Sequence, residues 1–340
     1  MSRRPDIAVL GAGSWGTALA IQLARGDRPA TLWGRAEDEP ERLAAERENA
    51  RYLPGAAFPP ALAIEPDFER AVTAHRDLLI AVPSHAFRVV CEQIAPLLRA
   101  GQRIAWATKG FEQRSGLLPH QVARQVLGEA PPLAVLSGPT FAREVGMGLP
   151  TAITAAATEP GFAADLAQRI SDERFRVYTS RDLTGVEVGG AVKNVLAIAT
   201  GMSDGIGYGA NTRIALISRG LVEMTRLGIA LGARLQTFMG LSGMGDLVLT
   251  CTDDQSRNRR MGLALAKGRD VDEVAREIGQ VVEGVYAAKA VHQVAAREGV
   301  EMPICEHVYG ILYENQSVED AVHSLMTRSL KAEAELPLPD

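Results

Sequence analysis

The sequence has few cysteines, no excess of basic residues and no metal-binding pattern. Its three cysteines, Cys91, Cys251 and Cys305, are far apart and form no CxxC pair, which argues against a disulfide framework and a zinc site. With 36 basic and 41 acidic residues, the formal net charge is -5. A general affinity for nucleic acid or for an anionic membrane is therefore not expected. The six histidines show no metal-ligand spacing, so we also expect no metal.

Segments that would cross or enter a membrane are missing as well. The long apolar segment at residues 186–202 contains Glu187 and Lys193, and the cost of placing these charges in lipid favours a buried core helix. The apolar run near the start of the chain is only as long as a strand and is broken by glycines, unlike a signal peptide. We therefore expect a cytoplasmic protein without stable membrane insertion.

The segment from residue 6 to residue 35 has the order of a nucleotide-binding unit. The apolar run Ile7–Leu10 is typical of a buried parallel strand, and it is followed at once by Gly11-Ala12-Gly13-Ser14-Trp15-Gly16 and a helical pattern over residues 17–25. In such a unit the first glycine permits a tight turn, the second lets the backbone approach a pyrophosphate, and the third allows close packing of helix on strand. The phosphates then lie at the N-terminus of the helix. A glycine-rich turn that only makes a tight connection is the alternative.

Arg35 stands at the end of the second strand, Ala30–Trp33. An NAD site usually has an Asp or Glu here to bind the ribose 2′-hydroxyl, whereas an arginine favours a 2′-phosphate and hence NADP. A solvated charge at a strand end is the structural alternative for Arg35.

Strand-like runs alternate with helix-like segments up to about residue 178, which is the pattern of a doubly wound α/β sheet. From residue 184 onward, helical periodicity dominates. We expect an N-terminal α/β Rossmann-type domain over residues 1–182 and an all-α domain over residues 183–340. A solvated helix is expected at residues 37–50. The expected strands are residues 7–10, 30–33, 77–82, 103–107, 133–136, 151–156 and 175–178.

Lys193 is the best candidate for proton transfer in the helical part. Its helix, around Gly189-Gly190-Ala191-Val192-Lys193-Asn194, is made of small and apolar residues, so the ammonium should be at least partly desolvated. Desolvation lowers the pKa of a lysine toward neutrality, which suits exchange of a proton with a hydroxyl or carbonyl oxygen. A lysine whose stem packs while its ammonium reaches water is equally compatible with this spacing.

A second group of polar residues consists of Asp246, which follows a glycine, and the run Ser256-Arg257-Asn258-Arg259-Arg260. A guanidinium, an amide and a hydroxyl within three positions could clamp a phosphate, and the aspartate could orient Lys193 or bind a substrate hydroxyl. Taken alone, these features also fit a glycine turn with a capping aspartate and a solvated basic helix start.

The motifs together resemble bacterial NAD(P)-dependent glycerol-3-phosphate dehydrogenase, from about residue 6 to about residue 315. The resemblance rests on an ordered series of blocks: Gly11-Ala12-Gly13-Ser14-Trp15-Gly16-Thr17-Ala18, Val82-Pro83-Ser84-His85, Lys109-Gly110, Ser137-Gly138-Pro139-Thr140-Phe141-Ala142, Ala191-Val192-Lys193-Asn194, Gly245-Asp246, Ser256-Arg257-Asn258 and Val282-Glu283-Gly284.

The resemblance implies a role for each matching residue. Lys193 would be the proton donor and acceptor. The cofactor NADP, possibly NAD, would be bound by Gly11, Gly13, Ser14, Trp15, Gly16, Arg35, Lys109, Ala142, Arg257, Val281 and Glu283. The substrate would be bound by Lys109, Gly138, Thr140, Lys193, Asp246, Ser256, Arg257 and Asn258. Tyr52 would either close over the cofactor or pack in the core, and His85 is taken as a structural residue.

The resemblance also implies a fold and a reaction. The helical domain would be like the C-terminal domain of 6-phosphogluconate dehydrogenase, and the protein would be a homodimer. The enzyme would reversibly reduce dihydroxyacetone phosphate to sn-glycerol 3-phosphate, a phospholipid precursor. Two alternatives remain from the residues themselves. One is a related hydroxyacid or sugar-nucleotide dehydrogenase, and the other is a non-catalytic NADP-sensing protein.

Overall fold

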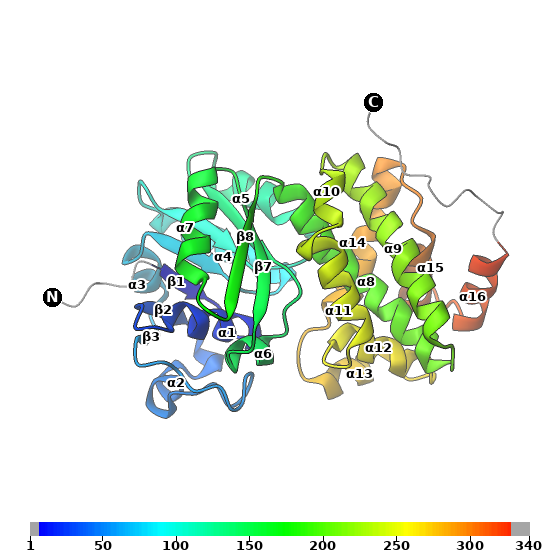
Figure 1. The fold of residues 1–340 in the computed structure, drawn as a ribbon, viewed down its shortest axis with the longest axis horizontal. Coiled ribbons are helices and arrows are strands. Elements are labelled where there is room, and N and C mark those ends of the chain that lie inside the picture. Colours follow the sequence, from blue (N-terminus) through cyan, green and yellow to red (C-terminus); the bar gives the residue numbers. More distant parts are fainter. Residues whose placement is uncertain (1–6, 328–340) are drawn as a thin grey trace. The chain divides into compact units, whose positions relative to one another are not determined.

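The computed structural model describes residues 7–327, which form two compact units (Figure 1). Unit 1 comprises the chain up to Thr108 and Pro119–Leu183, and unit 2 comprises Lys109–Leu118 and the chain from Thr184 on. The segment Lys109–Leu118 thus belongs to unit 2 although it is inserted in the sequence of unit 1. The expected domain ranges, 1–182 and 183–340, extend beyond the described residues at both ends.

Unit 1 is built on one eight-stranded sheet with the strand order β3-β2-β1-β4-β5-β6-β7-β8. All neighbouring strands are parallel except β6 and β7, which are antiparallel. The order reverses between β1 and β4, and in such sheets ligands bind outside the carboxyl ends of the strands at the reversal. The strands are β1 (Ile7–Leu10), β2 (Ala30–Trp33), β3 (Leu62–Glu65), β4 (Asp77–Ile80), β5 (Arg103–Trp106), β6 (Leu133–Ser137), β7 (Thr151–Ala157) and β8 (Phe175–Ser180).

Every residue of the strands β1, β2 and β4 is buried, as expected for strands that are covered on both faces of a sheet. This is why their short apolar runs were recognisable in the sequence. Strand β3 was not expected, because only Leu62 of its four residues is buried. It nevertheless pairs with β2 through all four of its residues and forms an edge of the sheet.

Helices cover both faces of this sheet, and α1 contacts both α6 and α7 (Figure 1). The solvated helix expected at residues 37–50 is found only in part: a 3₁₀ turn at Ala36–Asp38 is followed by the separate short helix α2, Pro40–Glu46. Glu39 and Arg47 interrupt the helical path because both have a left-handed backbone, with φ of 52° and 56°. The other helices are α1 (Ser14–Ala24), α3 (Phe68–Thr73), α4 (Phe87–Ile94), α5 (Pro119–Leu127), α6 (Ala142–Gly146) and α7 (Pro160–Ile170).

Unit 2 is a bundle of helices, and its described residues contain no strand (Figure 1). Its longest helix, α8, is buried from Gly185 to Ser203. Phe111 and Leu118 of the inserted segment belong to the same apolar core as α8, which accounts for their place in unit 2. The helices are α8 (Leu183–Gly205), α9 (Ala210–Ala230), α10 (Leu235–Phe238), α11 (Asp246–Thr252), α12 (Arg257–Leu265), α13 (Val271–Ile278), α14 (Glu283–Glu298), α15 (Pro303–Tyr313) and α16 (Val318–Met326).

The two units confirm the expected fold class, an α/β Rossmann-type sheet followed by an all-α part. Within residues 7–327, no helix combines the length and the apolar character that crossing a lipid bilayer requires. In the same part of the chain, no three His, Cys, Asp or Glu side chains are grouped so that they could hold a metal ion.

Candidate functional site

Lys193 lies in the middle of α8 and is 6% exposed. This confirms the prediction that its ammonium is at least partly desolvated. Burial lowers the pKa of Lys193 to about 8, because removal from water disfavours the charged form. The neighbouring carboxylate of Asp246 raises the pKa, and the nearby cation of Lys109 lowers it further. The result is a lysine whose two protonation states are both accessible near neutral pH, as a proton-transfer group needs.

Asp246 is fully buried and accepts hydrogen bonds from two lysines. Lys193 Nζ donates to Oδ1 at 2.5 Å, and Lys109 Nζ donates to Oδ2 at 2.7 Å. Lys193 also donates to Thr250 Oγ1 at 2.9 Å. Thr250 lies one turn after Asp246 on α11, so its hydroxyl is on the same side of that helix. These four side chains form a continuous polar cluster within unit 2, in which Lys109 is partly exposed and the other three are buried.

A close contact between α8 and the turn before α11 brings Asp246 to Lys193. Gly189 is one helical turn before Lys193, and a Cβ at Gly189 would lie 2.2 Å from the carbonyl oxygen of Ser242. Only glycine leaves room for this approach. Ser242 belongs to a π-helical turn, Leu241–Gly245, which leads directly into Asp246. Local π-helical geometry is frequent at functional sites, where it redirects a side chain.

The run Ser256-Arg257-Asn258 forms the start of α12 and is not a fully solvated basic segment. Ser256 is the N-cap, and its Oγ accepts a hydrogen bond from the backbone N–H of Arg259 at 3.2 Å. Asn258 is buried; its Nδ2 donates to Asn194 Oδ1 at 2.9 Å, and its Oδ1 accepts from the Gly284 N–H at 2.8 Å. Asn258 therefore ties the start of α12 to the residue next to Lys193.

Arg257 is the cation of this run that is placed to meet an anion. Burial lowers the pKa of its guanidinium, while the charge of Glu283 raises it. Its hydrogen-bonding partner is neutral, because Nη1 donates to Gln280 Oε1 at 3.1 Å. A partly desolvated guanidinium on a neutral partner suits the binding of a phosphate. Arg260, which lies three positions after Arg257 on the same helix, is exposed.

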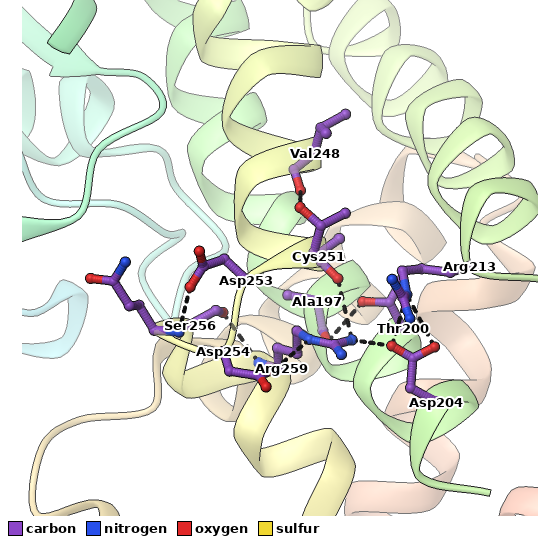
Figure 2. A network of polar contacts seen from close by, with 12 residues as sticks. Ala197, Thr200, Asp204, Arg213, Val248, Cys251, Asp253, Asp254, Ser256 and Arg259 are labelled. Atoms are coloured by element: carbon purple, nitrogen blue, oxygen red, sulfur yellow. Dashed lines mark hydrogen bonds and ion pairs between the residues drawn. The ribbon is translucent and has the colours of Figure 1, made fainter. Parts of the chain in front are cut away.

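An ion-pair network with a buried centre fixes the start of α12 to the end of α8 (Figure 2). Arg259 donates to Asp204 through Nη1 and to Asp254 Oδ1 through Nε at 2.8 Å. Arg213, in the first turn of α9, donates to the same Asp204 carboxylate at 2.8 Å. The side chains of Arg259 and Asp204 are each 8% exposed. The network holds the Ser256–Asn258 region in position relative to the helix that carries Lys193.

The glycine turn of unit 1 has the geometry expected for binding a dinucleotide phosphate. Gly11 has φ +124°, and a Cβ there would lie 2.6 Å from the carbonyl oxygen of Ala81. A Cβ at Gly13 would meet no atom within 4 Å, so the backbone is open at this point for a close ligand. Helix α1 begins after Gly13 without a side-chain cap from the described residues. An uncapped helix start next to open space is the arrangement that binds pyrophosphate.

The indole of Trp15 supports the same interpretation. Its Nε1 is buried and has no hydrogen-bonding partner among the described residues. A buried N–H without an acceptor costs free energy, so such groups commonly find their partner in a ligand or a water molecule. The residues of the turn therefore fit a dinucleotide cofactor. Arg35, by contrast, is exposed at the end of β2 and lies near the carboxylates of Glu37 and Asp38.

The remaining predicted residues are placed as follows. In unit 1, Thr140 Oγ1 donates to the Gly138 carbonyl at 3.1 Å, and Ala142 begins α6. In unit 2, Glu283 begins α14, close enough to Arg257 to affect its pKa. Val281, assigned to the cofactor only by resemblance, is partly buried just before α14. Tyr52 is partly buried beneath the guanidinium of Arg51. His85 is exposed in a short 3₁₀ turn after β4.

Sequence reasoning missed Thr250, Gly189 and Asp204. The spacing of four between Asp246 and Thr250 is a signal that was available, because residues four apart share one side of a helix. The same spacing joins Gly189 to Lys193. Asp204 had no comparable signal, since its partners Arg213 and Arg259 are 9 and 55 residues away.

Comparison with known proteins identifies relatives along nearly the whole chain. Residues 6–163 match the profile of the NAD-dependent glycerol-3-phosphate dehydrogenase N-terminus, and residues 182–323 match that of the C-terminus. A glycerol-3-phosphate dehydrogenase [NAD(P)+] of Shewanella baltica (strain OS185) is 57% identical over 334 residues, which cover 98% of this chain and 99% of that protein. A glycerol-3-phosphate dehydrogenase [NAD(P)+] of Aliivibrio fischeri is 55% identical over 330 residues, covering 97% and 96%.

Solved structures show the same relationship. The crystal structure of glycerol-3-phosphate dehydrogenase from Coxiella burnetii superposes with a TM-score of 0.92 at 47% identity, over 96% of this chain and 99% of that chain. D-mandelate dehydrogenase, at 12% identity and a TM-score of 0.60, shares the fold alone.

Proposed function

The chain belongs to the NAD-dependent glycerol-3-phosphate dehydrogenase family, and we propose that Lys193 exchanges the proton when it interconverts dihydroxyacetone phosphate and sn-glycerol 3-phosphate. The observation that supports this role is the buried pair formed by Lys193 and Asp246, 2.5 Å apart. A nicotinamide dinucleotide, when bound, would supply the hydride chemistry. The chain itself must transfer a proton to or from the substrate oxygen, bind the phosphate and bind the dinucleotide.

The ammonium of Lys193 has a hydrogen left for the substrate. An ammonium has three N–H donors, and in the described structure one points to Asp246 and one to Thr250. The third is available to the oxygen on the reacting carbon. In reduction Lys193 gives its proton to this oxygen and becomes a neutral amine, which is then reprotonated from water. In oxidation the neutral amine takes the proton from the hydroxyl group.

Asp246 and Lys109 adjust this lysine. The carboxylate favours the charged form of Lys193 and orients it, so the ammonium remains a usable donor although it is buried. Lys109, on the other oxygen of Asp246, places a second positive charge close to the reacting oxygen. We propose that this charge stabilises the negative charge that develops on the substrate oxygen as hydride arrives.

We further propose that the phosphate of the substrate is held at the start of α12. The partly desolvated guanidinium of Arg257 supplies charge, and Asn258 has a second amide N–H besides the one given to Asn194. Ser256 belongs to the same turn. Gly138 and Thr140 of unit 1 complete the proposed substrate-binding residues. Binding the non-reacting phosphate contributes to catalysis by fixing the position of the reacting carbon.

For the cofactor we propose the turn residues Gly11, Gly13, Ser14, Trp15 and Gly16. They combine an open backbone at Gly13 with a buried indole N–H that has no hydrogen-bonding partner among the described residues. NADP, and also NAD, are the proposed dinucleotides. The other proposed cofactor-binding residues are Arg35, Lys109, Ala142, Arg257, Val281 and Glu283.

The test of this function is a rate measurement on purified protein with dihydroxyacetone phosphate and either NADPH or NADH. We expect oxidation of the reduced cofactor that depends on the triose phosphate. Inorganic phosphate should compete with the substrate, because it can occupy the Arg257 site. Absence of turnover with both cofactors would contradict the proposal, and turnover that is insensitive to phosphate would contradict the role of Arg257.

Assembly, location and domain division are also proposals. We propose a homodimer in the cytoplasm, with the domains 1–182 and 183–340, that supplies the glycerol 3-phosphate used for phospholipids. Family resemblance supports the dimer. Light scattering of the protein as it elutes from a size-exclusion column should give twice the chain mass of 36.3 kDa. The mass of a single chain would refute the dimer.

A further inference from the structure

The charge at the end of β2 is balanced by a carboxylate that is built into the backbone turn. The backbone N–H of Arg35 donates to Asp38 Oδ2 at 2.9 Å, and the Nε of the same arginine lies 3.5 Å from that oxygen. Glu37 is further away, at 3.9 Å. The side chain of Asp38 is only 7% exposed, whereas those of Arg35 and Glu37 are 63% and 73% exposed. Asp38 is therefore a fixed partner of Arg35, and Glu37 is a loose one.

A second guanidinium lies beside the same turn. Arg51 Nη1 donates to the backbone carbonyl of Glu37 at 2.8 Å. The loop that carries Arg51 is itself attached to the glycine turn, because Asn49 Nδ2 donates to the Ala12 carbonyl at 2.8 Å. Arg51 is bonded to a carbonyl rather than to a carboxylate, and its remaining contact is with the ring of Tyr52. It thus brings positive charge to this end of the sheet from another part of the chain.

These contacts give two cations and two carboxylates around one strand end, Arg35 and Arg51 against Glu37 and Asp38. A 2′-phosphate carries close to two negative charges, so it is attracted by the two guanidinium groups and repelled by the carboxylates. A ribose 2′-hydroxyl has the opposite preference, because it can donate a hydrogen bond to a carboxylate. The balance of charge at this point therefore decides between the two cofactors.

We propose that Asp38 is the specificity-determining residue that limits the preference for NADP by holding Arg35, and that Arg51 is the second cation favouring the 2′-phosphate. The inference rests on the proposed dehydrogenase function and on Arg35 as the residue next to the ribose. Asp38 keeps NAD usable, since it cancels part of the positive charge that would otherwise favour a 2′-phosphate alone. Arg35 by itself does not settle the cofactor.

The test is calorimetric binding of NADP⁺ and of NAD⁺ to the full-length Asp38→Asn protein. Asparagine keeps an oxygen that can accept the Arg35 N–H, so the turn is retained while the negative charge is lost. We expect the affinity for NADP⁺ to rise about fivefold, the upper range for a single partly exposed ion pair, and the affinity for NAD⁺ to stay equal or fall. The gain should shrink at high salt, because a partly exposed charge is screened. Arg51→Ala should weaken NADP⁺ binding selectively.

The matched control is Glu46→Gln on α2. Glu46 forms an ion pair with Arg42, with 2.8 Å between Oε1 and Nε. Glu46→Gln therefore removes one negative surface charge, as Asp38→Asn does, but elsewhere in unit 1. An unchanged ratio of the two dissociation constants in Asp38→Asn, or the same change of that ratio in Glu46→Gln, would overturn the inference. If the unaltered protein binds neither dinucleotide, the proposed dehydrogenase function itself fails. If it binds both but Asp38→Asn leaves the ratio of the two dissociation constants unchanged, only the role of Asp38 fails.

Discussion

Lys193 and Asp246 form a hydrogen-bonded ion pair of 2.5 Å inside the helical unit, where neither side chain is more than 8% exposed. Two opposing effects act on this lysine. Burial and the cation of Lys109 favour the neutral amine, and the carboxylate favours the ammonium. The pair therefore makes the proton of Lys193 transferable near pH 8.

The pH dependence should have opposite signs in the two directions of the reaction. Reduction needs the ammonium, so kcat/KM for dihydroxyacetone phosphate should fall as the pH rises through about 8. Oxidation needs the neutral amine, so kcat/KM for glycerol 3-phosphate should rise through the same region. Initial rates over a pH series check both. Asp246→Asn should move the fall in the reductive direction to lower pH, because it removes the group that raises the pKa of Lys193. Identical pH profiles in both directions would contradict the assignment.

Replacing Lys193 should abolish proton transfer but not cofactor binding. We expect Lys193→Ala to lower kcat by about 10²- to 10⁴-fold, the usual contribution of a general acid or base. Calorimetric titration with NADP⁺ should give a dissociation constant close to that of the unaltered protein. Lys289 is exposed on α14 and provides the control, since Lys289→Ala should change neither quantity. Undiminished turnover in Lys193→Ala would remove Lys193 from the mechanism.

Replacing Arg257 should mainly affect substrate affinity. A hydrogen bond to a charged group contributes about 1.5–3 kcal/mol, so Arg257→Ala should raise KM for dihydroxyacetone phosphate by roughly 10- to 100-fold. Inhibition by inorganic phosphate should weaken in parallel. Arg260 is a suitable control, because it belongs to the same helix but is exposed. Equal losses in Arg257→Ala and Arg260→Ala would show that general positive charge, rather than the Arg257 position, attracts the substrate.

The sheet could be predicted from the sequence because its central strands are covered on both faces and therefore appear as apolar runs. The helical character after residue 184 could be predicted too, and α13 (Val271–Ile278) shows why, since its apolar positions repeat with helical spacing. Strand β3 had no such pattern, as its second residue is exposed and the next two are only partly buried. The break at Glu39 depends on a left-handed backbone that the residue type does not indicate.

The residues of the candidate site could be proposed from the sequence, but their geometry could not. Small neighbours of Lys193 pointed to its burial, and the run at Ser256 pointed to an anion site. The sharing of Asp246 by two lysines depends on contacts across 53 and 137 residues, for which local patterns carry no information. The same holds for Lys109–Leu118, whose place in the helical unit follows from the packing of Phe111 and Leu118 in its core.

The ion pair between Arg259 and Asp204 should support both stability and substrate binding. Removing one partner of a buried ion pair costs about 3–5 kcal/mol when the other charge is left unpaired. Because Arg259→Ala leaves Asp204 paired with Arg213, we expect a smaller cost. We expect a lower melting temperature and a raised KM for the triose phosphate, with a smaller change in kcat. Arg259→Lys should recover part of the KM. The control Arg269→Ala removes a partly exposed arginine whose two partners, Glu273 and Glu277, are themselves exposed, and it should have little effect. A raised KM with no rescue by lysine would contradict the positioning role.

Glu223 should make the stability of the helical unit depend on pH. Its buried carboxylate accepts the backbone N–H groups of Ile304 and Cys305 at 2.8 and 3.2 Å, at the start of α15. Burial raises its pKa from 4.5 to about 7, and the two hydrogen bonds only partly oppose this. Between these pH values the folded protein binds more protons than the unfolded chain, so the free energy of unfolding should fall as the pH rises.

At about 1.4 kcal/mol per pH unit, the shift from 4.5 to about 7 corresponds to a loss of about 3 kcal/mol across this range. Glu223→Gln has no ionisable group, so the difference between its free energy of unfolding and that of the unaltered protein should change by about this amount between pH 4.5 and pH 7. Urea denaturation at several pH values measures it. Glu319→Gln, on the exposed side of α16, should leave the pH dependence unchanged. A constant difference between the Glu223→Gln and unaltered proteins would mean that the pKa of Glu223 is the same in the folded and unfolded states, and that the two N–H groups of α15 offset the cost of burying its charge.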